Sequence, residues 1–470
     1  MRGSLLVVFL VPLMFDSIQC NANTEKDWYE TTALYQVYTR SFKDSNGDGI
    51  GDLNGILEKL DYIKDIGFQT VWIQSFFKSP MVDFGFDVTD FKTVDPTYGS
   101  MDDLRRLVDA IHEKGMKVLF DFVPNHTSDE SEWFKKSVNR EDPYKDFYIW
   151  KDPKSYDADS RPIPPNNWLS ILNGSAWRWN ERRKQFYYSI FRAGQPDLNY
   201  RNPKVRRAME DVLQFWLDFG FDGFRVDAPE CIFEDDLMRD NPWVSPEVVN
   251  STVFSSQIHT YQTDFEAVLQ LLYEWRTLLG GYNERDNVTR FYNEEKRMVA
   301  GELRFLENQC EKQLEDPRSP LNTFKRLMNL RSSPVILYGE WETCVVSEWI
   351  HMISRKLQGH PSIFVLVNMG SETESVCLNK CAHHQNVSDF MEVHKVHTAS
   401  ANSGYNIGDR VIVLRADSDC FSLRPKAGVV LTTGHISSTG FRTISSTLVS
   451  FTILLLKFML WDCRFGLNIP

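Results

Sequence analysis

The sequence carries no excess of positive charge. Its 470 residues include 52 lysines and arginines against 64 aspartates and glutamates, and the formal net charge is −12. The basic residues are scattered along the chain, whereas proteins that bind nucleic acid usually gather them on one face or in one segment. We therefore expect no nucleic-acid partner.

Long apolar runs are scarce in the middle of the chain. Two such runs lie near its ends. Arg2, the apolar stretch Leu5 to Phe15 and the small residue Cys20 have the order of a signal peptide over residues 1–20. That stretch is short for a membrane span. The pattern predicts entry into the secretory pathway and an extracellular or cell-surface location.

The tail, residues 434–470, contains the other apolar run, from Leu448 to Trp461, with small residues ahead of it. This order is compatible with a lipid-anchor signal, with a poor spanning helix or with a frayed amphipathic tail. Membrane attachment through the tail therefore stays open.

Cysteine is also sparse, with eight in the chain. Cys377 and Cys381 have the only close spacing, and no second Cys or His pair follows at a distance typical of zinc sites. In an oxidising compartment we expect some disulfides, although spacing does not give their connectivity. We expect no organic cofactor.

What the chain does have is an early alternation of strand-like and helix-like segments. Strands are predicted at 34–38, 70–73 and 117–122, with amphipathic helices between them that end at Gly67 and Gly115. Another helix begins at Pro203 and ends at Gly220, and a buried strand follows it. Repeated strand–helix units imply a parallel sheet, and their order suits a TIM-type (β/α)₈ barrel.

Two stretches break this alternation. Residues 127–201 are rich in Pro, Trp, Asn and Ser without helical periodicity, and a structureless loop of that length is improbable. After about residue 359 the chain becomes β-like, with apolar runs at 363–367, 410–414 and 428–431.

Four short motifs follow one another in the chain. They are Gly85-Phe86-Asp87, Asp121 to His126 (Asp-Phe-Val-Pro-Asn-His), Gln195 to Asn199 (Gln-Pro-Asp-Leu-Asn) and Gly223 to Ala228 (Gly-Phe-Arg-Val-Asp-Ala). In the last motif an aspartate ends a buried strand two residues after an arginine. Its carboxylate is therefore expected at the end of the strand where active sites open, with its negative charge stabilised by the arginine. A lone aspartate there would more simply cap the next helix. The ordered set, however, closely resembles the α-amylase family of glycoside hydrolases, especially the oligo-1,6-glucosidase and maltase branch with its insect secreted or gut-surface α-glucosidases.

The resemblance implies a domain plan. The barrel would comprise residues 28–126 and 202–358, with a small domain, residues 127–201, inserted after the third strand and covering one side of the active site. Residues 359–433 would form a C-terminal antiparallel β domain, for which a generic β-sandwich is the structural alternative.

The resemblance also implies the chemistry. Retaining hydrolysis of a glycoside uses two carboxyl groups about 5–5.5 Å apart. Asp227 matches the nucleophile, and Arg225 is expected to keep it ionised. His126 and Asp87 match residues that bind the terminal glucose, while Phe86 stands where relatives often carry Tyr. Glu302, at the end of a run that resembles the fifth strand, is the candidate acid, and an ordinary surface glutamate is the alternative. The expected substrate is an oligosaccharide or disaccharide with a terminal α-linked glucose, as in maltose or sucrose.

The late barrel is missing from this pattern. After about residue 303 the sequence resembles the segment near the last barrel helix, and the family's Asn-His-Asp motif occurs nowhere. Three strand–helix units would need about 90 residues, more than the stretch 303–358 provides. We therefore expect an incomplete barrel and an isoform with little or no activity. The alternative function is a non-catalytic surface ectodomain, as in the heavy subunits of amino-acid transporters.

The segment Asp44 to Asp52 places oxygen ligands at alternate positions around glycines, as calcium loops do. Gly55 stands where an EF-hand would have its final Glu, so the segment instead resembles the metal loop of maltase relatives. A plain Asp/Gly turn is the alternative. The expected structural Ca²⁺ ligands are Asp44, Asn46, Asp48, the Ile50 carbonyl and Asp52.

Overall fold

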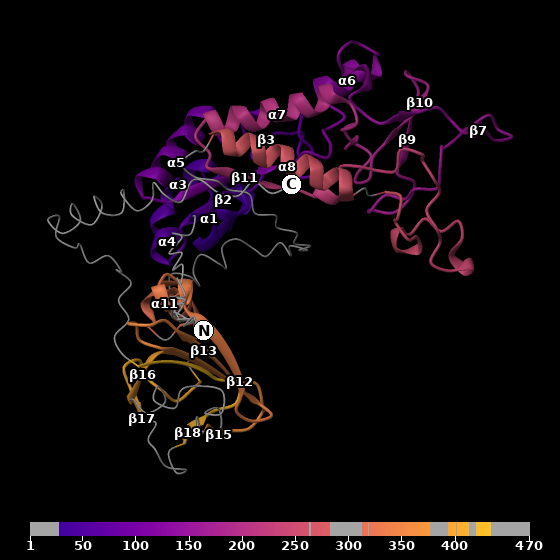
Figure 1. Cartoon of the computed structure of the whole chain (residues 1–470). Coiled ribbons are helices and arrows are strands. Elements are labelled where there is room, and N and C mark those ends of the chain that lie inside the picture. Colours follow the sequence, from indigo (N-terminus) through magenta and orange to yellow (C-terminus); the bar gives the residue numbers. More distant parts are fainter. Residues whose placement is uncertain are drawn as a thin grey trace, which may run out of the picture.

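A computed structural model of the chain describes residues 28–262, 265–282, 313–317, 319–376, 393–400, 402–412 and 420–433. The predicted signal peptide, the candidate acid Glu302 and the apolar tail lie outside these residues. Figure 1 shows the parallel sheet and its helices above, the inserted segment with β7, β9 and β10 to one side, and the C-terminal sheet below. None of the helices in the described ranges is both long and apolar enough to cross a membrane.

The first half of the chain builds a four-stranded parallel sheet with the order β1-β2-β5-β11. Its strands are β1 (Leu34–Val37), β2 (Thr70–Ile73), β5 (Lys117–Phe122) and β11 (Gly223–Val226). β2 and β5 have the bounds that their apolar runs predict. The prediction of a parallel sheet formed by strand–helix units is thus confirmed.

The described part of the chain forms no closed barrel, and an incomplete barrel is what the sequence predicts. The parallel sheet there stops at β11, and the next described segments are helices and an antiparallel sheet. Closure of a small barrel requires matched strand number and stagger, and four strands remain an open sheet.

Helices cover the parallel sheet, and their ends follow local capping rules. α5 (Met101–Glu113) begins at Ser100, whose side chain and that of Asp103 form a reciprocal capping box. α7 (Pro203–Asp218) begins after Asn202, whose side chain accepts from the Lys204 amide. The remaining helices of this half are α1 (Trp28–Thr31), α2 (Thr39–Phe42), α3 (Leu53–Glu58), α4 (Leu60–Asp65) and α8 (Phe265–Tyr282).

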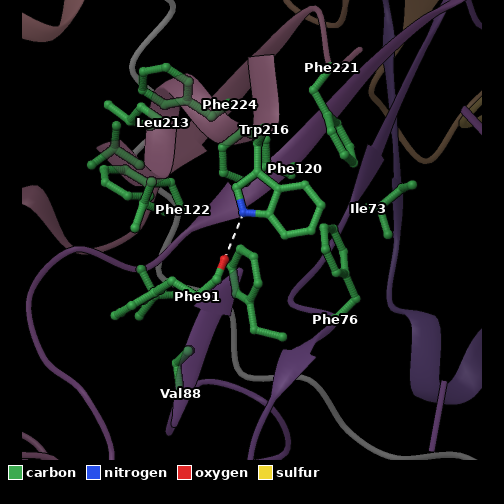
Figure 2. Close-up of a cluster of buried hydrophobic side chains, with 14 of the residues drawn as sticks. Ile73, Phe76, Val88, Phe91, Phe120, Phe122, Leu213, Trp216, Phe221 and Phe224 are labelled. Carbon is green, nitrogen blue, oxygen red and sulfur yellow. Dashed lines mark hydrogen bonds between the residues drawn. The ribbon is translucent and has the colours of Figure 1, made fainter. Parts of the chain in front are cut away.

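The apolar face of α7 packs into an aromatic core. Trp216 is fully buried, and its ring meets Phe76, Phe120 and Phe221 at centroid distances of 5.2, 6.2 and 5.8 Å (Figure 2). Its indole N–H donates to the Phe91 carbonyl at 2.7 Å, which ties α7 to the hairpin of β3 (Phe77–Lys78) and β4 (Asp90–Val94). A buried indole needs such a partner, and this one fixes the hairpin against the sheet.

The interrupting stretch is folded and carries its own apolar cluster of Trp168, Trp177, Phe186 and Tyr188. Its main sheet has the order β6-β10-β9, from β6 (Trp150–Lys151), β9 (Trp177–Asn180) and β10 (Gln185–Tyr188). The other elements are α6 (Glu132–Val138), η1 (Tyr144–Asp146) and the pair β7 (Ser155–Tyr156) and β8 (Pro162–Ile163). α6 is too short for its sequence to show a helical repeat, so no helix was predicted there.

The C-terminal sheet begins earlier than the predicted boundary at residue 359. Its order is β12-β13-β14-β19-β16-β17, and it starts at Glu340. The side chains of β12 are mostly exposed on both faces, so its sequence lacks the alternation that marks a strand. The strands are β12 (Glu340–Val345), β13 (Ile350–Lys356), β14 (Ile363–Asn368), β16 (Val393–Ala399), β17 (Arg410–Ile412) and β19 (Gly428–Thr432), with a separate pair β15 (Glu374–Val376) and β18 (Phe421–Leu423).

Two helices connect this sheet to the parallel one. α10 (Pro320–Arg331) reaches the first strand–helix unit, where the Phe324 ring lies 5.8 Å from that of Phe68 and Arg331 donates to the Thr31 carbonyl at 2.7 Å. α11 (Pro334–Tyr338) follows it and packs on β13. Contact between α10 and the first strand–helix unit is what a last barrel helix would make.

Candidate active site

The carboxyl ends of β5 and β11 bring three charged side chains together. Arg225 lies opposite Asp121 in the sheet register, and its Nη1 donates to Asp121 Oδ1 at 2.9 Å. The same nitrogen donates to Asp227 Oδ1. The guanidinium also lies over the Trp72 ring, 5.2 Å from its centroid. One arginine thus links two carboxylates at the sheet edge where ligands of α/β folds bind.

Burial dominates the electrostatics of this group. Asp121 is 0% exposed, and its desolvation raises its pKa to about 7 although Arg225 opposes the rise. The pKa of Arg225 is lowered by burial and raised by its two carboxylate partners, and the net shift is upward. The guanidinium therefore carries a permanent positive charge beside Asp227.

A backbone turn aims Asp227 outward. Its amide donates to the Phe122 carbonyl at 2.8 Å, which continues the sheet, and its side chain is 21% exposed. Ala228 then adopts the left-handed region, with φ of 41°, and leads into η2 (Pro229–Cys231). A non-glycine residue in this conformation carries strain, and such strain concentrates at functional sites.

His126 faces the same group from the end of β5. It is 2% exposed, and its Nε2 donates to the Phe86 carbonyl at 3.1 Å while its Nδ1 accepts from Asn125 at 3.3 Å. Burial lowers its pKa, and the nearby Asp227 carboxylate partly offsets this effect. The ring is therefore neutral, with the proton on Nε2.

Asp87 lies in the loop before β4 and organises that loop. Its carboxylate accepts from Ser79 Oγ at 2.7 Å, from the Val82 amide at 2.9 Å and from the Asp83 amide at 3.0 Å. It is 2% exposed. Since an ionised carboxylate has about four acceptor positions, these bonds leave little capacity for a sugar hydroxyl.

Several supporting residues lie in or close to the same motifs, and the sequence predicts no role for them. Asp197 is buried, and it accepts from Asn125 Nδ2 at 3.0 Å and from the Ile190 amide at 3.1 Å; burial raises its pKa well above its usual range. Asp83 binds Arg192 and Gln195 of the inserted segment at 3.0 and 2.8 Å. For Asp197 and Gln195, membership in a motif was the available signal. Asp83 and Arg192 lie outside the motifs, and their contact depends on the tertiary fold.

The matching family model is that of the alpha amylase catalytic domain, and it covers residues 36–306. The chain belongs to the α-amylase family. One relative of this α-amylase-family chain is the salivary alpha-glucosidase of Aedes aegypti, which is 45% identical over 60% of the chain and 48% of the relative. Another is maltase 1 of Drosophila virilis, which is 48% identical over 54% of the chain and 40% of the relative. The chain therefore spans about half the length of these relatives, or less.

Two further likenesses bear on function and fold. An amino acid transporter heavy chain, SLC3A1 of Rattus norvegicus, is 42% identical over 57% of the chain and 39% of its own length. The crystal structure of an alpha-glucosyl transfer enzyme, XgtA, superposes with a TM-score of 0.68 at 25% identity over 87% of this chain and all of that one. The open parallel sheet of the described residues therefore corresponds to part of the (β/α)₈ barrel of this family.

For an α-amylase-family chain the structure brings together only part of the predicted site. Asp227, Arg225 and His126 converge, and Asp87 is buried in the loop that carries Phe86, whose carbonyl His126 binds. Glu302 lies outside the described residues, so the structure places no acid opposite Asp227 within the part of the chain that it describes.

The predicted metal loop is organised by its own hydrogen bonds. Asp44 accepts from the Gly47 and Gly49 amides at 2.7 and 2.8 Å, and these bonds lower its pKa. Asn46 and Asp48 are exposed, whereas Asp52 is buried, accepts from Ser45 and caps α3 through the Gly55 amide at 2.7 Å.

The oxygen atoms of this loop are only partly suited to bind a hard cation such as Ca²⁺. Asp44, Asn46 and Asp48 offer oxygens on one exposed loop, while the oxygens of Asp52 already serve local structure. Within the described ranges, no group of three or more His, Cys, Asp and Glu side chains is arranged to hold a metal.

Proposed function

We propose that this chain derives from a retaining α-glucosidase and that Asp227 is its nucleophile. The single observation that carries the proposal is the Arg225 guanidinium between Asp121 and Asp227 at the ligand-binding edge of the parallel sheet. Membership in the α-amylase family and the names of the insect relatives support the same chemistry.

The reaction would follow the two-step retaining course. The Asp227 carboxylate attacks the anomeric carbon as the bond to the leaving oxygen breaks, and a carboxylic acid protonates that oxygen. Water then attacks the glycosyl–Asp227 ester, with the second carboxylate accepting its proton, and glucose leaves with retained configuration. We assign the acid role to Glu302 on its sequence resemblance alone.

The substrate would be a disaccharide or short oligosaccharide with a terminal α-linked glucose, such as maltose or sucrose. The neutral His126 ring lies beside Asp227, where its N–H can move from the Phe86 carbonyl to a sugar hydroxyl. Such contacts position the anomeric carbon for attack. Asp87 would act mainly by holding the loop that carries Phe86.

The decisive test removes the nucleophile without changing its shape. Asp227→Asn should abolish hydrolysis of a nitrophenyl α-glucoside, while Asp211→Asn on the exposed face of α7 should leave the rate unchanged. Both proteins should melt as the parent does. Equal turnover by the parent and Asp227→Asn would refute the assignment.

We further propose that the chain in this form turns over substrate slowly, because the late strands that close the barrel and supply a third carboxylate are absent from its sequence. Loss of one electrostatic contact of that kind costs about 10²–10³ in turnover. A chimera that carries the late-barrel segment of an insect relative should exceed this chain in activity per mole by at least that factor. Equal activity would overturn the proposal.

The metal loop is proposed as a structural Ca²⁺ site with Asp44, Asn46, Asp48, the Ile50 carbonyl and Asp52 as ligands. When bound, the ion would hold the loop closed and take no part in the hydrolysis. An extracellular location, reached through the signal peptide, is proposed on the sequence of residues 1–20.

A non-catalytic surface ectodomain is the second candidate. The 42% identity to an amino acid transporter heavy chain favours it, as does the open sheet in the described part of the chain. Secretion of folded protein without detectable hydrolysis in either this chain or the chimera would select this function over the first.

A further inference from the structure

A cavity separate from the Asp227 site lies between the β3–β4 hairpin, the start of α6 and Val212 of α7. We propose that it binds a short neutral saccharide. Its volume is about 640 Å³, within the range of about 300–1,000 Å³ of small-molecule sites. Its lining residues do not include Asp227, Arg225 or His126.

The walls of this cavity are held in place before any ligand arrives. Phe91 is buried, and its carbonyl accepts from the Trp216 indole at 2.7 Å (Figure 2). Asp95 is also buried and accepts from the Ser79 and Thr97 amides at 3.0 and 2.9 Å. The floor is therefore preorganised, which lowers the entropic cost of binding.

The charges that line the cavity nearly balance. Three lysines, Lys78, Lys92 and Lys135, stand against four carboxylates, Asp90, Asp95, Glu130 and Glu132. Such a mixed lining offers no net attraction for an anion and little for a cation. A polyhydroxylated neutral ligand suits it, because each hydroxyl can donate to a carboxylate and accept from an ammonium group.

Apolar groups complete the lining. The half-buried Trp133 lies at the cavity and packs on Phe91 and Phe147 at centroid distances of 5.9 and 5.5 Å. Phe91, Pro80 and Val212 add further apolar surface. An aromatic side chain beside polar groups matches a pyranose ring, which is apolar on its C–H faces and polar at its rim.

The cavity adjoins the loop before β4 without opening on Asp227. Ser79 lines it, and the hydroxyl of Ser79 donates to Asp87 at 2.7 Å. A saccharide bound there would be held beside the active-site loop at a place with no nucleophile. Binding is thus independent of hydrolysis, and it can be measured whether or not the chain is active.

The test uses the full chain with 5-fluorotryptophan in place of tryptophan and maltotriose as the probe. Fluorine NMR of Trp133→Phe identifies the Trp133 signal, and Trp179→Phe, in the inserted segment, is the matched control. We expect millimolar maltotriose to move the Trp133 signal in a saturable way, with the same midpoint in Asp227→Asn.

A second variant tests the polar lining without disturbing the packing around Trp133. Lys92→Met keeps the apolar stem and removes the ammonium group, which lies 5.6 Å from the Phe215 ring centroid, so it should weaken binding about tenfold. Lys184→Met, at an exposed ion pair with Glu181, should have no effect.

Three outcomes would overturn the proposal. The Trp133 signal could remain fixed in folded protein, or its shift could disappear in Asp227→Asn, which would mean that it reports the active site. A larger response to inorganic phosphate than to maltotriose would instead identify an anion site formed by the lysines.

Discussion

Replacing Asp121 by asparagine should change how stability depends on pH. Asp121 is completely buried, and its pKa is raised to about 7. An unfolded aspartate has a pKa of about 3.9. Between about pH 4 and pH 7 the folded chain therefore binds more protons than the unfolded chain, so its stability falls as the pH rises.

The size of the effect follows from the two pKa values. The difference of about three units corresponds to about 4 kcal/mol of unfolding free energy. This contribution is complete below about pH 4 and is lost as the pH rises through about 7. The amide side chain of the variant would not titrate, and its NH₂ group would replace Asp121 Oδ2, which has no hydrogen-bond partner among the described residues. An unpaired buried amide costs about 1–3 kcal/mol.

Asp121→Asn should therefore be less stable than the parent at pH 4 and as stable or more stable at pH 8. Urea unfolding followed by tryptophan fluorescence between these pH values measures the difference, because groups away from Asp121 and its partner Arg225 titrate alike in both proteins. A difference that stays constant from pH 4 to pH 8 would refute the reasoning.

Asp222→Asn provides a control of opposite sign. Burial raises the pKa of Asp222, but hydrogen bonds from His112, Lys117 and the Val118 amide outweigh it and the net shift is downward. Its contribution to stability is present above the unfolded pKa and lost as the pH falls. The variant should therefore differ most from the parent at high pH and converge with it in acid.

Two further predictions concern the loop at Asp48 and the turn at Ala228. Calcium at about 100 times its Kd should stabilise the parent by about 2.7 kcal/mol and raise its Tm. Asp48→Ala should lose most of this response, whereas Asp102→Ala, at the exposed start of α5, should keep it. An equal response in Asp48→Ala counts against the site. Because Ala228 has a φ of 41°, Ala228→Val should lower stability by about 1–3 kcal/mol and Ala228→Gly should preserve or raise it in the same unfolding assay; a neutral Val substitution contradicts the assigned strain.

Sequence predicted those parts of the fold that local pattern controls. β2 and β5 are mostly apolar segments bounded by turns, so their limits were readable. β12 was not, since its mostly exposed side chains follow no alternation. The inserted segment is built from short strands and a two-turn helix, whose patterns are too brief to recognise.

The same distinction holds for the candidate site. Arg225 lies on β11 and Asp227 directly follows its last residue, two positions further along, so their pairing on one face was foreseeable. The part taken by Asp121 depends on the register of β5 against β11, which no local pattern gives. The inward orientation of Asp87 is likewise a property of the folded loop.

The contact between α10 and the first strand–helix unit sets a condition on the order of folding. Arg331 and Thr31 are 300 positions apart, so the chain that emerges first from the ribosome lacks one of its neighbours until more than two thirds of the sequence has been made. Contacts of such long sequence separation form late, because a large loop must close before they contribute. Until then the surface around Phe68, which Phe324 later covers, remains exposed and available to chaperones or to other nascent chains. Any change in the length of the segment between α8 and α10 therefore alters the delay before that surface is covered.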